Sequence, residues 1–207
     1  MTSRDLILAR VRRNQPAWRE LPDVPSFARP LADPWAAFSS ALARMGGRVA
    51  PPPAGTTLDA FVRSLHPDAK VICSAVPEIE GTRRIADVRH PAELDDVDVG
   101  VVRGAFGVAE TGSVWLSERE FAVNALGFLS QYLVVLLDPH AIVADLHDAY
   151  RDARFREVRY AVLMTGPSAT ADIEGVLIRG AQGIRSFTVV PCAVDPSDAR
   201  AEQRRAS

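Results

Sequence analysis

Two turns carry most of the side chains that could bind a ligand or take part in catalysis. The first, Glu110-Thr111-Gly112, places a carboxylate and a hydroxyl beside a glycine. The second follows Thr165 and holds a Gly-Pro pair, two hydroxyls and two carboxylates, at Gly166, Ser168, Thr170, Asp172 and Glu174. Ligands in open α/β sheets bind just beyond the carboxyl ends of strands. We therefore expect each turn to follow a strand, and the two turns to face one cleft.

The second turn has two interpretations. As a structural feature, Thr170 would cap a helix and Asp172 would lie in its first turn, where a carboxylate favours the helix dipole. As a site, the hydroxyls and free backbone N–H groups would bind a ligand at the helix N-terminus. The carboxylates suit a hydroxylated or cationic ligand better than a phosphate. Either way the sequence predicts a helix after this turn, with a buried face made by Ile173, Val176, Leu177 and Gly180.

Predicted strands and helices, which must position these turns, alternate along the chain. Apolar runs predict strands at residues 71–76, 99–116, 132–137, 160–164 and 187–192, with a hairpin turn at residues 110–112. Capping residues predict that helices start at Asp33-Pro34, Thr57 and Asp138-Pro139. Continuous apolar strands between helices favour an α/β fold with a mostly parallel sheet covered on both faces.

One domain is the simplest organisation for this pattern. We expect a single α/β domain over residues 31–195, an N-terminal helix and arm over residues 1–30, and a polar tail over residues 196–207. The arm is weakly amphipathic, and it either packs on a neighbouring subunit or partner, or frays.

Composition and motifs exclude several classes of function. The 207 residues carry a net charge of −2, which gives no basic field for nucleic acid. Cys73 and Cys192 lie in separate apolar runs without a C-x-x-C motif, so we expect two buried free thiols and no metal site. No phosphate-binding motif predicts a nucleotide, and no cofactor is expected. The sequence lacks a secretory signal and a run of roughly 20 apolar residues, which predicts a cytoplasmic protein without membrane contact.

Two segments resemble a known family. A-E-T-G-S-V-W-L at residues 109–116, and T-G-P-S-A-T-A-D-I-E followed by R-G-A-Q-G at residues 165–183, are similar to the LUD domain family of the lactate utilization protein C type. The resemblance implies a Rossmann-like three-layer sandwich related to the sugar-phosphate isomerase and CoA-transferase superfamily. It also implies a role in oxidation of L-lactate to pyruvate, with iron–sulfur and cysteine-rich partner subunits. Gln182 stands where family members often carry His, so a His-based role is not available there.

Glu110 has a further interpretation through this resemblance. CoA transferases of the related fold carry a nucleophilic Glu in a short Glu-x-Gly turn, which Glu110-Thr111-Gly112 resembles. Such a carboxylate attacks an acyl thioester, and glycine-rich backbone supplies oxyanion donors. The structural alternative is a polar residue at a hairpin turn, with Gly112 at positive φ. Three functions therefore stay open: a lactate-utilization accessory protein, a free-standing transferase or sugar-phosphate isomerase-like enzyme using Glu110, and a non-catalytic scaffold.

Overall fold

A parallel six-stranded sheet forms the centre of the molecule. The computed structural model describes residues 2–25, 30–172 and 174–193. The sheet order is β1-β12-β7-β4-β2-β3, and every neighbouring pair is parallel. Its strands are β1 (Arg48–Val49), β2 (Ile72–Ser74), β3 (Arg83–Arg84), β4 (Val99–Arg103), β7 (Tyr132–Leu137) and β12 (Ser186–Pro191). The predicted α/β class with a mostly parallel sheet is confirmed.

A second sheet of four strands has the order β8-β5-β6-β9. Its strands are β5 (Phe106–Val108), β6 (Ser113–Ser117), β8 (Ile142–Val143) and β9 (Ala161–Met164). The antiparallel β5–β6 hairpin confirms the predicted turn at residues 110–112. β9 is antiparallel to β6, with Trp115 opposite Leu163. The turn after Thr165 therefore follows strand β9 of this second sheet, and the prediction that it follows a strand is confirmed.

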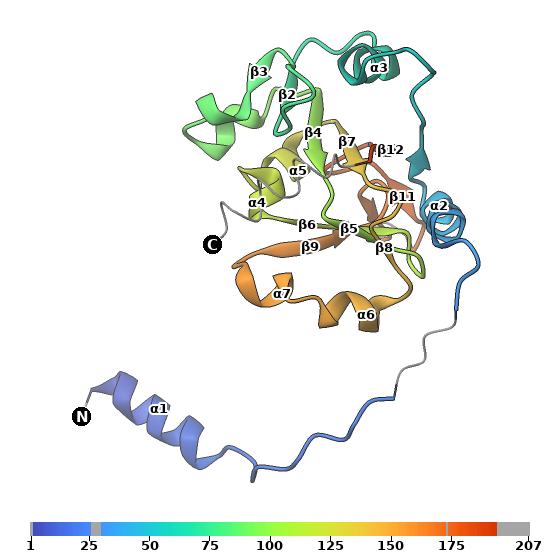
Figure 1. Ribbon diagram of the computed structural model, residues 1–207. Coiled ribbons are helices and arrows are strands. Elements are labelled where there is room, and N and C mark those ends of the chain that lie inside the picture. The colour runs from blue at the N-terminus through green and yellow to red at the C-terminus, as the bar shows by residue number, and fades with distance from the viewer. Residues whose placement is uncertain (1, 26–29, 173, 194–207) are drawn as a thin grey trace.

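Short helices lie around the two sheets, except α1 (Ser3–Arg13), which lies away from them (Figure 1). The others are α2 (Pro34–Arg44), α3 (Leu58–Leu65), α4 (Glu118–Phe121), α5 (Leu126–Leu129), α6 (Leu146–Arg151) and α7 (Arg154–Glu157), with 3-10 turns at Ile85–Asp87 and Pro91–Leu94. The predicted caps of α2 and α3 are confirmed, because Asp33 accepts from the amide of Ala36 and Thr57 accepts from the amide of Ala60. Among the helices of the described ranges, none has the length and apolar composition that a bilayer crossing needs.

Alternation of side chains along the central strands divides the core into layers. Val134 and Leu136 of β7 face the cluster that holds Phe61 and Val62 of α3. The intervening β7 residues face the opposite cluster, together with α2 and the inner side of β6. The outer side of the second sheet packs Trp115 at 1% exposure against the layer of α6 and α7 (Figure 1). The second sheet thus occupies the place of a helical layer.

Two predicted helices are wrong. Residues that were expected to form a helix after Asp172 belong to an antiparallel hairpin of β10 (Ala169–Thr170) and β11 (Ile178–Arg179). Gly175 and Gly180 have positive φ, and Val176 and Leu177 are about 60% exposed, so these apolar residues make no buried helix face. Ile173, the remaining member of that predicted face, lies outside the described residues.

The other wrong helix was expected to start at Asp138-Pro139. Asp138 instead accepts a hydrogen bond from the amide of His140 in a turn, and β8 follows. The helix starts seven residues later, at α6, where Asp145 caps the amide of Asp148. Asp-Pro chemistry supports a turn as well as a helix start, and pairing of β8 with β5 decides between them here.

Candidate functional site

The last turns of helix α2 bring the two predicted turns together. Gly112 has φ +70°, and a Cβ placed on it would lie 2.1 Å from the backbone nitrogen of Leu42. Gly166 also has φ +70°, and its Cβ would lie 2.6 Å from the carbonyl oxygen of Met45. Only glycine combines this backbone conformation with such a close approach. Both turns therefore lie directly against the same end of α2.

Three hydroxyls form a continuous chain between the turns. The hydroxyl of Ser113 is hydrogen-bonded to the hydroxyl of Thr165 and, at 2.7 Å, to that of Thr111. The Ser113 amide also donates to Thr111 Oγ1 at 3.3 Å, and Ser113 is only 4% exposed. Each hydroxyl can donate or accept, so the chain can run in either direction.

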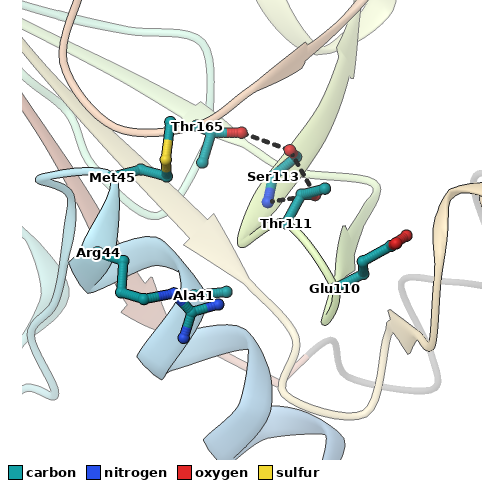
Figure 2. Close-up of a pocket in the computed structure, with 7 residues that line it drawn as sticks. All are labelled: Ala41, Arg44, Met45, Glu110, Thr111, Ser113 and Thr165. Carbon is teal, nitrogen blue, oxygen red and sulfur yellow. Dashed lines mark hydrogen bonds between the residues drawn. The ribbon is translucent and has the colours of Figure 1, made fainter.

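An open pocket with a volume of about 320 Å³ lies beside this hydroxyl chain (Figure 2). Its lining comes from the last turns of α2, from the β5–β6 turn and from the end of β9. The residues are Ala41, Arg44, Met45, Glu110, Thr111, Ser113 and Thr165. The pocket therefore combines a guanidinium, a carboxylate, three hydroxyls and a small apolar surface.

Arg44 supplies the positive charge of the pocket. Its side chain lies along α2, with the guanidinium beside Ala41 (Figure 2). It donates to Ser40 Oγ at 3.3 Å, and within the described part of the chain it forms no ion pair. Its other N–H donors have no protein acceptor among the hydrogen bonds of the described residues.

Glu110 lines the same pocket but points away from the hydroxyls (Figure 2). One of its carboxylate oxygens accepts the backbone N–H of Leu146 at 3.0 Å, at the start of α6. The backbone N–H of Glu110 donates to Ala144, which continues the pairing beyond β8. The Glu110 carboxylate thus forms a structural hydrogen bond at the rim of the pocket.

The remaining predicted residues lie on the β10–β11 hairpin, outside the pocket lining. The backbone of Ser168 pairs with Gly180 and Ile184 at the base of the hairpin. Thr170 donates to Asp172 at 2.8 Å and accepts the amide of Asp172. Glu174 is exposed with φ +54°. The interpretation of Thr170 as a helix cap is wrong, because strand β11 lies where the helix was predicted.

The sequence analysis missed five residues of the lining that complete the site: Ala41, Arg44, Met45, Ser113 and Thr165. Ala41, Arg44 and Met45 recur at the helical spacing i, i+3, i+4, and this pattern was a signal for a shared face. Their approach to Thr111 depends on tertiary packing, which local patterns do not encode. Ser113 directly follows the predicted turn, and its hydroxyl at the start of an apolar strand was the more accessible signal.

The cysteines and histidines form no metal centre in the part of the chain that the structure describes. Both cysteines are free, as predicted; Cys73 is buried, whereas Cys192 is half-buried. Burial raises the pKa of the Cys73 thiol to about 11, which keeps this thiol protonated at neutral pH. Cys73 is therefore held in the thiol form, which is a much weaker nucleophile than the thiolate.

Comparison with known proteins gives matches over the same region. The LUD domain model matches residues 69–190, which is more than half of the chain. Lactate utilization protein C of Deinococcus radiodurans is 30% identical over 102 residues, which are 48% of this chain and 48% of that protein. The chain thus matches this curated relative over about half of the relative's length.

A solved structure supports the fold. The crystal structure of a DUF162 family protein from Deinococcus radiodurans matches with a TM-score of 0.58, over 78% of this chain and 99% of that chain. Sequence identity between the two is 19%, so this likeness concerns the fold alone. The matched family model contains both turns of the pocket, whereas the α2 residues precede its first matched residue.

Proposed function

The chain belongs to the LUD domain family, and on that premise we propose that it is a cytoplasmic accessory protein of L-lactate utilization. In this proposal it holds a small ligand in the pocket beside Arg44 and the hydroxyl chain. Iron–sulfur and cysteine-rich partner subunits carry the oxidation of L-lactate to pyruvate.

The observation that supports this function is the convergence of the two family-like turns on one polar pocket. Thr111 and Ser113 come from the first turn, and Thr165 begins the second. Glycines at positions 112 and 166 hold both turns against α2. A polar lining built by close backbone packing is pre-organised, which reduces the entropic cost of binding a small molecule.

The N-terminal arm offers a surface for the proposed partner subunits. Residues 2–25 run as α1 and an extended segment away from the sheets (Figure 1). The arm bears six large exposed apolar residues: Leu6, Ile7, Val11, Trp18, Leu21 and Val24. Arginines in the last turn of α1 add positive charge. We propose that this arm contacts an acidic surface of one partner subunit.

Growth of a gene-deletion strain tests the proposed function. A strain without this gene and without other family members should fail on L-lactate and grow on glucose. Wild-type protein and Thr56→Val, which alters an exposed hydroxyl outside the pocket, should restore growth. Thr165→Val should not, because it removes a hydroxyl of the pocket at nearly constant side-chain shape. Normal growth of the deletion strain on L-lactate contradicts the proposal.

The alternative proposal is acyl transfer with Glu110 as the nucleophile. It is supported by the position of Glu110 at the pocket and by one carboxylate oxygen that is not used by Leu146. Glu110→Gln should then abolish any acyl-CoA-dependent activity, and hydroxylamine should trap the acylated enzyme. Retained lactate-dependent growth with Glu110→Gln favours the accessory function instead. A non-catalytic scaffold, the third alternative, predicts that no small molecule raises the melting temperature.

A further inference from the structure

The carboxyl edge of the parallel sheet carries a polar cluster that is separate from the pocket at α2. Strand β4 ends at Arg103, and Cys192 directly follows the end of β12. The amide of Cys192 donates to the carbonyl of Leu137 at 2.9 Å, at the end of β7, and β7 lies between the other two strands. In open α/β folds the crevice outside this edge is where ligands bind. Cys192 and Arg103 thus lie on the two sides of one strand end at this edge.

Arg103 holds the cluster together. Its Nη2 atom donates to Sγ of Cys192 at 3.7 Å and also forms an ion pair with the carboxylate of Glu78. Its Nη1 atom is shielded from solvent and has no acceptor among the residues that the structure describes. A shielded guanidinium N–H without an acceptor is costly, and an oxygen atom placed beside it would recover part of that cost. The cluster therefore joins a nucleophilic sulfur to a donor that lacks a partner.

The two thiols of the chain differ in exposure and in their contact with charge. Cys73 is buried within β2, and its pKa of about 11 keeps it protonated at neutral pH. Cys192 is half-buried and contacts the guanidinium of Arg103 directly. Reactive cysteines are partly exposed and lie beside cationic side chains, which stabilise the thiolate that attacks an electrophile. Cys192 has these surroundings, and Cys73 serves as its internal control.

We propose that Cys192 is a modification site for peroxides, and that Arg103 stabilises both its thiolate and its oxidised form. The thiolate sulfur attacks one oxygen of hydrogen peroxide, so that an S–O bond forms while the O–O bond breaks. The other oxygen leaves as hydroxide and takes up the proton that the thiol released, which gives water. Sulfur loses two electrons, peroxide gains them, and the product is a sulfenic acid. Its oxygen lies beside Arg103 and accepts the N–H that lacks a partner.

An external thiol must complete the cycle, because the two cysteines lie on opposite faces of the sheet. Cys73 belongs to the core cluster on the α2 face, whereas Cys192 packs against the cluster on the α3 face. A disulfide between them would have to cross the sheet. The sulfenic acid therefore condenses with a low-molecular-weight thiol, which forms a mixed disulfide and releases water. A second molecule of that thiol restores Cys192 by exchange and leaves as the symmetric disulfide.

Peptide mapping of the full chain measures the two thiols separately. Trypsin releases Cys73 within residues 71–83 and Cys192 within residues 186–200. The folded protein is treated with hydrogen peroxide and dimedone, which traps sulfenic acid, and mass spectrometry follows each peptide over time. Cys192 should gain the adduct at least ~10-fold faster than Cys73, and in urea the two rates should converge. Equal rates in the folded protein, or an adduct on neither cysteine, overturn the modification site.

Exposure alone also favours Cys192, so charge variants test the role of Arg103. Arg103→Gln should slow formation of the Cys192 adduct at neutral pH by ~5-fold or more, because the thiolate loses its cation. Arg103→Lys keeps the charge and should retain most of the rate. Glu78→Gln should raise the rate about 2-fold, because a negative charge beside the thiolate is removed. Arg84→Gln, on the exposed end of β3, is the matched control and should react as the wild type does.

The opposite directions of the two effects separate charge from structure. Local loss of structure would expose the sulfur and speed the reaction in Arg103→Gln and Glu78→Gln alike. Slower reaction in the first and faster reaction in the second supports the role of Arg103, whereas a change in the same direction, or no change, overturns it. The modification needs no ligand in the pocket at α2, so growth on L-lactate and labelling of Cys192 test separate proposals.

Discussion

Gly112 is the residue on which the geometry of the pocket depends most. Replacement by Ala adds a Cβ that would lie 2.1 Å from the backbone of α2 at a positive φ. We expect Gly112→Ala to lower the free energy of unfolding by about 2–4 kcal/mol, from strain and overpacking together. Gly55→Ala is the matched control, because Gly55 has φ +78° and open space around it, and it should cost about 1 kcal/mol. Equal losses in urea denaturation would refute the close contact with α2.

Cys73 gives the stability a specific dependence on pH. Burial raises the pKa of its thiol from 9.0 to about 11 in the folded protein, although the nearby charge of Arg83 acts in the opposite direction. Above pH 9 the unfolded chain loses this proton while the folded chain keeps it, so the free energy of unfolding falls as pH rises from about 9 to 11. Denaturation at several pH values should give a shallower fall for Cys73→Ala. An identical slope in both proteins contradicts the raised pKa.

At the scale of elements, Glu110 connects the β5–β6 turn to helix α6. Its carboxylate accepts the amide of Leu146, and Asp145 accepts the amide of Asp148 one turn away. Glu110→Ala should lower the free energy of unfolding by about 1 kcal/mol, since the amide loses its acceptor. Glu110→Gln keeps an acceptor oxygen and should stay close to the wild type. Urea denaturation checks both, and equal destabilisation by Gln and Ala would show that charge, rather than the hydrogen bond, matters.

Local chemistry also explains which elements could be predicted from the sequence. Asp33 and Thr57 start helices as predicted, because a cap acts on amides only three residues away. The helix predicted after Asp172 failed because the apolar spacing of Val176 and Leu177 fits a helix face and an exposed hairpin equally well. Pairing of β10 with β11 favours the hairpin over the helix. Gly175 and Gly180, which have positive φ in the structure, were the residues in the sequence that argued against a helix.

At the scale of the whole molecule, the arm and the domain are separate in their contribution to stability. Residues 2–25 contain no buried side chain. Deletion of residues 1–25 should therefore change the free energy of unfolding of the domain by less than about 0.5 kcal/mol. In pull-down experiments the same deletion should abolish capture of the proposed partner subunits. A marked loss of stability on deletion would show that the arm packs on the domain.

The site could be predicted only in part, because it is assembled by contacts between residues that lie far apart in the sequence. The sequence predicted that the Glu110 turn and the turn after Thr165 share a cleft, and the structure brings Thr111, Gly112 and Gly166 to one end of α2. Contacts between Ser113 and Thr165 span 52 positions, and Arg44 comes from a helix with no motif of its own. Such long-range contacts follow from packing of the layers rather than from any local pattern.

Backbone amide shifts during titration with L-lactate test the central claim most directly. A ligand between Arg44 and the hydroxyl chain should shift the amides of Arg44, Met45, Thr111, Ser113 and Thr165 more than all others. The same titration of Arg44→Gln should require at least ~10-fold more L-lactate for equal shifts. Largest shifts on the β10–β11 hairpin, or no shifts at saturating L-lactate, would contradict the assignment of this pocket as the ligand site.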